Sequence, residues 1–399
     1  MTASVSEVAA DRLAKEVVHP DVDDDPDPQS LIRGTAAIAL LAVERAAAGR
    51  GSWDTAHHWL AASIREGAET GGHATLFYGA PALAFTFHGA AHPGRYDRAL
   101  TVLDSATTAV TRERLKAAHA RIDRRQRPAL AEFDLIYGLT GLGAHHLRRD
   151  PHGQVLRDVL AYLVRLTEPI GVPPYGLPGW WTDLAPSGEL SPQFPDGHAN
   201  QGTAHGIAGP LALLSLAMKR GITVDGHAQA IGRICSWLDR WQQRTTTGAW
   251  WPEWIALDEH RTGVVHQQAP MRPSWCYGTP GLARAQQLAG QATDDPARQR
   301  LAESALLGCL ADPAQLARIT DGGLCHGWAG LFQAAVRVAD DADGPEISER
   351  LAALLPYLVS GPQVPHSGFL DGSVGLALAL HTATGTAPAT GWDSCLLLN

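Results

Sequence analysis

The most regular feature of the sequence is an alternation between apolar segments rich in alanine and leucine and longer segments that also carry charge. Each apolar segment opens on one signature: a glycine, two further residues, and then glycine or alanine. The spacing of the apolar residues that follow predicts a helix after each signature. Seven copies occur, 45 to 72 residues apart, and they begin at Gly34, Gly79, Gly138, Gly206, Gly278, Gly327 and Gly372.

The segments between these copies predict a second set of helices. Residues 104–124, 226–244 and 296–310 are amphipathic, and Asp295 before Pro296 is a typical helix start. Small-residue helices alternating with amphipathic ones favour an all-α fold, an α/α toroid with seven inner and about seven outer helices. The signature glycines and alanines fit inner helix ends that converge and leave little room for side chains. Prolines in the first turns are tolerated there: Pro81, Pro210 and Pro280.

Two connections are too long to be simple turns. Residues 168–203 and 245–273 both contain tryptophan pairs and prolines. Long ordered loops are usually functional, so these two could shape a mouth over one end of the ring. The alternative is that the tryptophans are buried and pin the loops to the body. The sequence leaves both interpretations open.

Composition and charge narrow the class of protein. The chain has 399 residues, of which 45% are hydrophobic, and a net charge of −9, which argues against nucleic-acid binding. We expect residues 1–29 to be a flexible extension, because 20–29 are acidic and proline-rich, and residues 30–399 to be one domain. The N-terminus lacks the pattern of a signal peptide, and the apolar stretch 206–218 is too short to span a membrane. Five sparse cysteines indicate a reduced, cytoplasmic protein.

Aligning the seven copies on their first glycine gives a candidate site. In a toroid the residues just before these glycines face one another around one end of the axis, so we expect a polar cluster there. One position earlier the residues are apolar except for Cys276 and Cys325. The seven residues that precede the glycines all hydrogen-bond or ionise: Arg33, Tyr78, Tyr137, His205, Tyr277, His326 and Asp371.

Two cysteines in one register, with His326 next to Cys325, favour a metal site. Three protein ligands with a fourth position open are the arrangement of catalytic Zn²⁺ sites. The alternative is that Cys276 and Cys325 are inert buried thiols, because no compact zinc motif is present. The remaining cysteines fall outside the register and are predicted to be packed or terminal thiols: Cys235, Cys309 and Cys395.

The motifs around these residues resemble those of the lanthionine synthetase C-like family, which includes the nisin cyclase-like class I lanthipeptide cyclases. The resemblance covers the whole body and rests on AHGIAGPL (204–211), SWCYGTPG (274–281), CHGWAG (325–330) and the seven glycine repeats. It implies that Cys276, Cys325 and His326 bind Zn²⁺. It also implies four residues with catalytic roles: His205, Asp134 four residues before Gly138, Arg272 four residues before Cys276, and Tyr277.

The activity implied by the resemblance is addition of peptide cysteine thiols to dehydroalanine or dehydrobutyrine, which forms (methyl)lanthionine thioether rings. His205 would then deliver a proton, Arg272 would stabilise an enolate, and Asp134 would orient its partners or take up a proton from them. The implied substrate is a dehydrated precursor peptide with its leader, and a dehydratase and an exporter are candidate partners. Three alternatives remain open: addition of a free thiol such as glutathione, a non-catalytic scaffold, and a zinc hydrolase.

Overall fold

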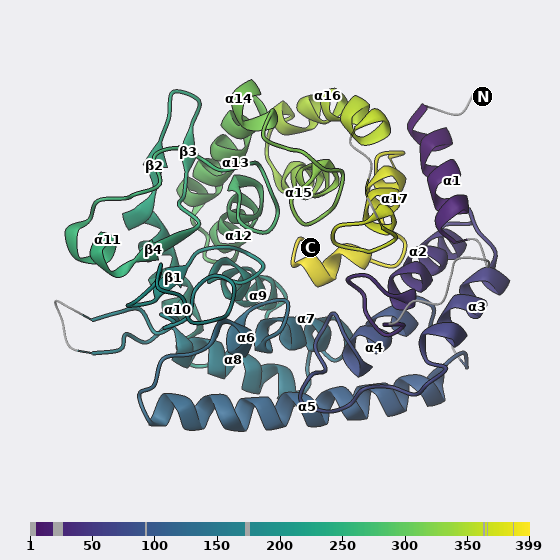
Figure 1. Cartoon of the computed structure of the whole chain (residues 1–399), viewed down its shortest axis with the longest axis horizontal. Helices are drawn as coiled ribbons and strands as arrows, with labels where there is room; N and C mark the ends of the chain where they lie inside the picture. The colour runs from purple at the N-terminus through teal and green to yellow at the C-terminus, as the bar shows by residue number, and fades with distance from the viewer. Residues whose placement is uncertain are drawn as a thin grey trace. The chain divides into compact units, whose positions relative to one another are not determined.

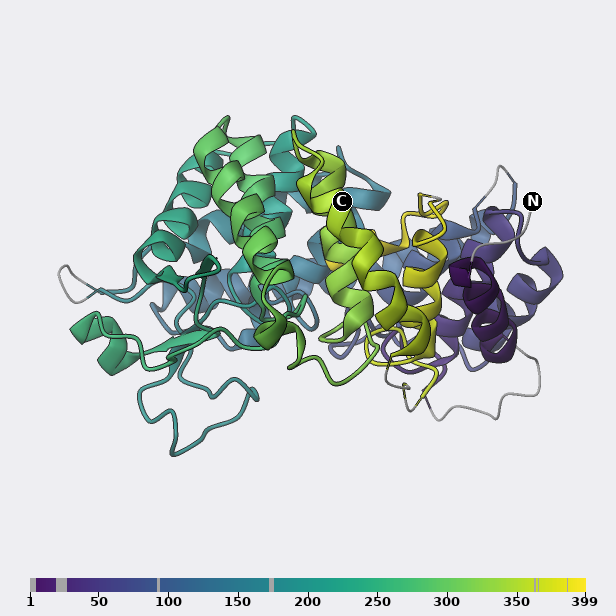
Figure 2. The same ribbon diagram turned by 90° about the horizontal axis from the view of Figure 1, so that it is seen from above.

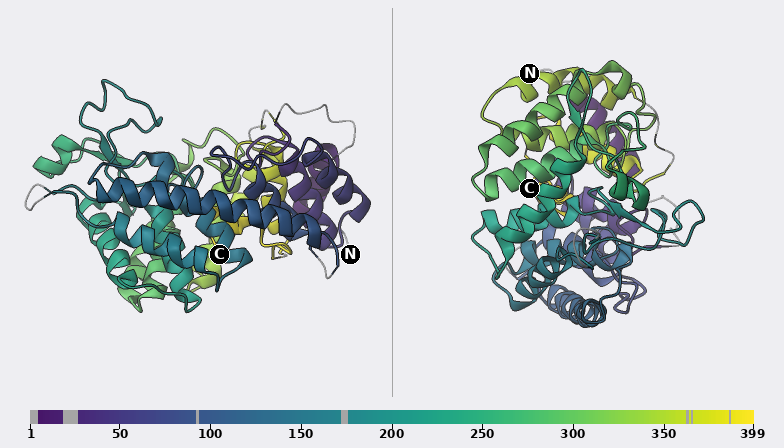
Figure 3. Two further views of the ribbon diagram at one scale, coloured as in Figure 1. Left: turned by 90° about the horizontal axis from the view of Figure 1, so that it is seen from below. Right: turned by 90° about the vertical axis from the view of Figure 1, so that its left-hand side faces the viewer.

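The structure is a computed structural model that describes residues 5–18, 27–91, 94–171, 176–361, 364, 366–385 and 387–399. The chain divides into two compact units. The first comprises residues 1–110, 319–395 and 399, and the second comprises 111–318 and 396–398. The boundary near residue 110 falls inside the long helix α5 (Asp97–Asp123), drawn in blue in Figure 3. The single domain of residues 30–399 therefore stays a prediction.

The predicted inner helices are present in the described residues. Six of the seven signature glycines are the N-cap of a helix, and the seventh, Gly206, lies two residues before its helix begins. Most residues of these helices are buried. The helices, labelled in Figure 1, are α2 (Thr35–Ala47), α4 (Ala80–Gly89), α7 (Leu139–Arg149), α9 (Ala208–Lys219), α12 (Thr279–Ala292), α15 (Trp328–Asp341) and α17 (Ser373–Thr382).

The physical reason for the signature glycines is local crowding. At Gly138 and Gly278 the backbone is extended, a conformation open to any residue. A Cβ atom at Gly138 would lie 2.4 Å from the nitrogen of Asp134, and one at Gly278 would lie 2.3 Å from the nitrogen of Ser274. The chain folds back on the turn just before each helix, so the turn itself excludes a side chain.

The amphipathic segments form the helices that pack against the inner ones. In the first unit α2 packs on α3 and α4, and α15, α16 and α17 lie side by side (Figure 2). In the second unit α12 packs on α9 and α13, and α7 packs on α8. Predicted segment 104–124 begins earlier, as α5, and segment 226–244 is α10. The bounds of the outer helices are α3 (Trp53–Ser63), α8 (Gln154–Leu166), α10 (His227–Trp241), α13 (Pro296–Leu310) and α16 (Glu346–Ser360). Four short helices complete the set: α6 (Leu130–Phe133), α11 (Leu257–Thr262), α14 (Pro313–Leu316) and the 3-10 helix η1 (Trp392–Leu396).

The N-terminal segment differs from the expected extension. Residues Val5–Val17 form helix α1, which packs on α17. Ala10, Ala14 and Val17 are buried, because helical spacing places them on one face. Ion pairs join the same helix to α2 and the turn after it, Asp11 with Arg45 at 3.0 Å and Glu7 with Arg50 at 3.1 Å. The prediction of a poorly packed extension is therefore wrong for residues 5–17, and residues 19–26 lie outside the described part.

The two long connections contain short strands that the helical pattern did not predict. Strand β1 (His198–Asn200) of the first connection pairs antiparallel with β4 (Trp254–Ala256) of the second. A second pair joins β2 (Gln243–Arg244) to β3 (Ala249–Trp250). Both tryptophan pairs are buried, at 4% exposure or less: Trp180, Trp181, Trp250 and Trp251. These tryptophans therefore pin the connections to the second unit, which was one of the two interpretations left open.

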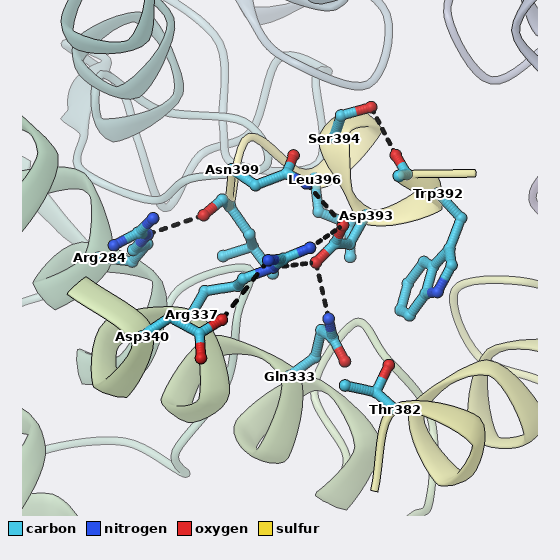
Figure 4. A network of polar contacts seen from close by, with 12 residues as sticks. Arg284, Gln333, Arg337, Asp340, Thr382, Trp392, Asp393, Ser394, Leu396 and Asn399 are labelled. Carbon is cyan, nitrogen blue, oxygen red and sulfur yellow. Dashed lines mark hydrogen bonds and ion pairs between the residues drawn. The ribbon is translucent and has the colours of Figure 1, made fainter. Parts of the chain in front are cut away.

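The C-terminal segment carries a buried ionic network in the first unit. Asp393 is fully buried, and its carboxylate accepts hydrogen bonds from Arg337 at 2.6 and 2.9 Å and from Gln333 at 2.6 Å (Figure 4). The side-chain amide of Asn399 donates to the same carboxylate. In the second unit, the guanidinium of Arg284 donates to the carbonyl of Leu398. Among the described residues no helix has both the length and the apolar character that a membrane span requires.

Candidate active site

Backbone hydrogen bonds tie together the segments that precede the inner helices. In the second unit the nitrogen of Leu135 donates to the carbonyl of Ala204, and the nitrogen of Thr203 donates to the carbonyl of Cys276. In the first unit the same pattern links Cys325 to Leu370. Residues of one register are therefore held next to one another, as the alignment on glycine predicts.

The side chains of the second unit follow this backbone order. The ring of Tyr137 stacks on that of His205, with 5.7 Å between centroids and 23° between planes. His205 in turn lies 6.4 Å from the ring of Tyr277. Three residues from three repeats, each just before a signature glycine, thus form one row of aromatic rings.

Asp134 forms hydrogen bonds with two of the residues in this row, Tyr137 and His205. It is fully buried, and its Oδ1 accepts the backbone N–H groups of Tyr137 at 2.7 Å and Gly138 at 2.8 Å. Its Oδ2 lies 2.6 Å from Nδ1 of His205. Because a carboxylate accepts hydrogen bonds, this contact places the imidazole proton on Nδ1 and leaves Nε2 of neutral His205 without a proton. The His205 side chain is 28% exposed, so the imidazole can still reach a bound molecule.

Ser274 occupies the matching position before the cysteine. It lies four residues before Gly278, as Asp134 lies four before Gly138, and its hydroxyl accepts from the nitrogens of Tyr277 and Gly278. The Cys276 thiol also donates to this hydroxyl, with 3.6 Å between sulfur and oxygen. The turn fixes the backbone of Cys276, whose side chain is 6% exposed.

A further carboxylate, Glu253, lies in the second long connection and was missed by the sequence analysis. Burial raises its pKa, the charge of Cys276 adds to that effect, and the charge of Arg272 opposes it. Arg272, like Glu253, is half-buried. Glu253 is therefore close enough to Cys276 and Arg272 for their charges to change its pKa. The only sequence signal for Glu253 is its place among the tryptophans of a long loop.

Tyr277 has a polar partner that the sequence analysis also missed. The side-chain amide of buried Asn200, on β1, donates to the hydroxyl of Tyr277 at 3.1 Å. Burial raises the pKa of Tyr277, and the hydrogen bond from Asn200 partly offsets that rise. The hydroxyl is therefore protonated at neutral pH.

His326 is set between two carboxylates in the first unit. Its Nε2 lies 3.5 Å from Oδ2 of Asp321, and its Nδ1 lies 4.0 Å from Oδ1 of Asp371. The side chain of His326 is 29% exposed. Carboxylates beside a metal-binding histidine commonly orient the imidazole.

The three residues predicted to bind a metal ion, Cys276 in the second unit and Cys325 and His326 in the first, each offer one ligand atom. Two of the other cysteines differ in character, because burial raises the pKa of Cys235 to about 11 and that of Cys309 to about 12. Cys395 is buried, and its thiol donates to the carbonyl of Trp392. All three fit the predicted role of packed thiols.

Comparison with known proteins agrees with this geometry. A family model for lanthionine synthetase C-like proteins matches residues 25–397. The nisin biosynthesis protein NisC of Lactococcus lactis subsp. lactis is 23% identical over 283 residues, which span 67% of this chain and 64% of that protein. The solved structure of a nisin cyclase has a TM-score of 0.80 at 20% identity, covering 99% of this chain and 96% of that one.

The likeness to nisin cyclase confirms the predicted fold class, an all-α protein of the α/α-toroid type. The fold is thus of the same class as that of the solved nisin cyclase. The chain belongs to the lanthionine synthetase C-like family. The match to NisC spans less than two thirds of the length of that relative.

Proposed function

We propose that this protein is a zinc-dependent lanthipeptide cyclase. It adds a cysteine thiol of a peptide to the β-carbon of a dehydroalanine or dehydrobutyrine in the same peptide, which forms a lanthionine or methyllanthionine ring. The observation that carries the proposal is the match of the lanthionine synthetase C-like family model to residues 25–397 of a chain that has Cys276, Cys325 and His326 just before its signature glycines.

The donor set suits zinc. Two thiols and one imidazole are the ligands that this ion prefers in proteins, and three protein ligands leave a fourth position open. The two thiolates lower the Lewis acidity of the ion and so favour thiol activation over hydrolysis. When bound, zinc lowers the pKa of a coordinated thiol and so supplies the nucleophile at neutral pH.

The pair of His205 and Asp134 handles protons in this proposal. Addition forms one carbon–sulfur bond, removes the proton of the thiol and leaves a negative charge on the enolate of the former dehydro residue. A proton must then reach the α-carbon. Nδ1 of His205 lies 2.6 Å from Oδ2 of Asp134 and donates its proton to that oxygen. The Nε2 atom is therefore the one that can carry a proton to the substrate. Asp134 orients the imidazole through this hydrogen bond.

Arg272 and Tyr277 act on the enolate. The guanidinium of Arg272 is a permanent positive charge with several donors, and it is half-buried, where a charge-assisted hydrogen bond is stronger than in water. Glu253 is close enough to Arg272 for the positive charge of the arginine to lower the pKa of the carboxyl. The two donors stabilise the charge that develops in the transition state.

The substrate in this proposal is a dehydrated precursor peptide with its leader, and a dehydratase and an exporter are the partners we propose. The exposed Tyr137 side chain, beside His205, offers an aromatic surface to such a peptide. We place the protein in the cytoplasm, where thiols stay reduced and the five cysteines can remain unpaired by disulfides.

The test is mass spectrometry of a dehydrated precursor with a thiol-alkylating reagent, before and after incubation with the protein. Cyclisation removes the alkylation sites without changing the peptide mass. A mass increase equal to added glutathione would instead identify a free-thiol transferase. Unchanged peptide would favour a scaffold, and cleavage of the peptide would favour a hydrolase.

A further inference from the structure

A buried chain of hydrogen bonds reaches Tyr277 from strand β1. His198 and Asn200 on this strand are both fully buried. The amide nitrogen Nδ2 of Asn200 lies 3.1 Å from the hydroxyl of Tyr277 and 3.4 Å from Nε2 of His198. At the far end, Nδ1 of His198 lies 2.8 Å from the carbonyl of Leu184. These contacts form one continuous path of four groups inside the second unit.

The orientation of the Asn200 amide is fixed by a backbone group. The nitrogen of Gly202 donates to Oδ1 of Asn200 at 3.0 Å, and a backbone N–H can only donate. The NH₂ group must therefore point the other way, toward Tyr277 and His198. A Cβ at Gly206 would lie 2.5 Å from the same Oδ1, so the chain packs tightly around this amide.

The tautomer of His198 follows in the same way. The carbonyl of Leu184 can only accept, so Nδ1 of His198 carries the proton and Nε2 accepts from Asn200. Burial lowers the pKa of His198 to about 4, which agrees with a neutral ring. Each of the two N–H bonds of Asn200 thus has one acceptor, Nε2 of His198 and the oxygen of Tyr277.

The direction of these hydrogen bonds determines whether the Tyr277 hydroxyl can donate to the substrate. Since its oxygen accepts from Asn200, its own proton is free of that contact and is available to another acceptor. Tyr277 follows Cys276 in the chain, and its ring lies next to that of His205. We propose that Asn200 is a positioning residue that holds the Tyr277 hydroxyl as a hydrogen-bond donor to the enolate oxygen of the substrate. This inference rests on the proposed cyclase function.

The test replaces the hydrogen-bond donor of Asn200 by an acceptor. Asn200→Asp keeps the shape of the side chain but replaces the donor by an acceptor, so the Tyr277 hydroxyl would donate its hydrogen bond to the new carboxylate and not to the substrate. We expect kcat to fall about 10- to 100-fold, with KM changed less than about threefold, since the lost interaction forms only in the transition state. In a Tyr277→Phe background the same substitution should lower kcat less than about threefold, because the group it acts through is absent.

A neighbouring amide gives the matched control. Gln201 is also fully buried, but its side chain donates to the carbonyl of Pro252. Gln201→Glu therefore reverses a buried donor that does not touch Tyr277, and its effect should multiply with that of Tyr277→Phe. Zinc content and thermal melting of every variant separate this effect from loss of metal or fold. If Asn200→Asp does not fold, Asn200→Ala replaces it in the same cycle.

The outcomes separate this inference from the function beneath it. A wild-type protein that forms no ring would overturn the proposed function and this inference together. Wild-type turnover with an unchanged kcat in the folded, zinc-loaded Asn200 variant would overturn this inference alone. This inference would also be overturned if the decrease in kcat of the Asn200, Tyr277 double variant equalled the product of the two single decreases, because Asn200 would then act independently of the Tyr277 hydroxyl.

Discussion

Two histidine–carboxylate pairs lie at inner helices of different units, and they differ in ways that bear on function. In the second unit, His205 stands before α9, 2.6 Å from Asp134, with 28% of its side chain exposed. In the first unit, His381 lies in the last turn of α17, 3.8 Å from Glu44, with 5% exposed. The residue types are alike, but only His205 can reach a bound substrate.

The carboxylates explain the contrast further. Asp134 receives two backbone N–H groups on one oxygen and gives its other oxygen to His205. Glu44 receives the nitrogens of Ala389 and Thr390 and the hydroxyl of Thr390, so both of its oxygens hold a segment of chain. A carboxylate can therefore orient an exposed imidazole only where one of its oxygens is left for that contact. In the proposed function the pair of His205 and Asp134 is catalytic, and the pair of His381 and Glu44 is structural.

Removal of a metal ligand should have the largest effect, because it takes away the nucleophile on which the catalytic pair acts. Cys276→Ala, Cys325→Ala and His326→Ala should each lose most of the bound zinc, about one ion per chain in the parent, and all ring formation. Metal analysis and the alkylation assay measure the two quantities. Cys309→Ala is the control, because this buried thiol lies outside the group and should leave both unchanged. Full zinc occupancy in all three ligand variants would refute the ligand assignment.

The comparison itself is tested by substituting both histidines. His205→Asn should lower kcat about 100- to 10,000-fold with zinc retained, because a proton carrier is lost. His381→Asn, on the structural side, should leave kcat within about threefold of the parent. Asp134→Asn should behave as His205→Asn does, since the amide no longer fixes the imidazole proton. Equal effects of the two histidine substitutions, or zinc loss in His205→Asn, would erase the distinction.

The sequence predicted the inner helices because their cause is local. A signature glycine is needed where the chain folds back on its own preceding turn, as at Gly138 and Gly278, so a spacing of a few residues carries the information. The cysteine register is visible for the same reason. The helix α1 was missed although Ala10, Ala14 and Val17 show helical spacing, because the acidic, proline-rich residues after them favoured a loose extension.

The parts that the sequence could not predict depend on contacts between distant segments. Asp134 and Ser274 occupy the same turn position, yet only Asp134 reaches a histidine, and that histidine is 71 residues away. Asn200 and Glu253 lie in loops without periodicity, where pairing of β1 with β4 sets their positions. The difference between His205 and His381 likewise appears only when burial is known.

The proposed role of Arg272 beside the pair of His205 and Asp134 is tested by two substitutions. Arg272→Ala should lower kcat about 100-fold with zinc retained, and Arg272→Lys should lower it less, because lysine keeps the charge but loses the planar fork. Arg318→Ala is the matched control: its guanidinium donates to the carbonyl of Pro270 and so anchors the same loop. Steady-state kinetics on the three variants decide the matter. If Arg272→Ala affects kcat no more than Arg318→Ala does, Arg272 only anchors the loop.

Glu44 should show its structural role as lost stability. Glu44→Gln removes the charge that holds Ala389 and Thr390, and it replaces one acceptor oxygen by a donor facing a donor. The free energy of unfolding should fall by about 1–3 kcal/mol, while kcat per folded molecule stays the same. Denaturant unfolding followed by circular dichroism measures it. A lower kcat at an unchanged free energy of unfolding would mean that Glu44 acts in the reaction and not in holding the fold together.

The smallest expected effect is in the pH dependence of stability. Burial lowers the pKa of His381; Glu44 and Asp11 oppose this effect, and Arg50 and Arg45 add to it. The neutral ring is therefore favoured in the folded state, while the unfolded chain takes up a proton near pH 6.5. The stability that neutral His381 contributes is present above that pH and is lost as the pH falls below it. The His381→Asn variant should accordingly lose stability less steeply between pH 7 and pH 5 than the parent, by less than one proton in the slope. Denaturant titrations of both proteins at several pH values measure the two slopes. A steeper slope in the variant would mean that His381 is charged in the fold and forms an ion pair with Glu44.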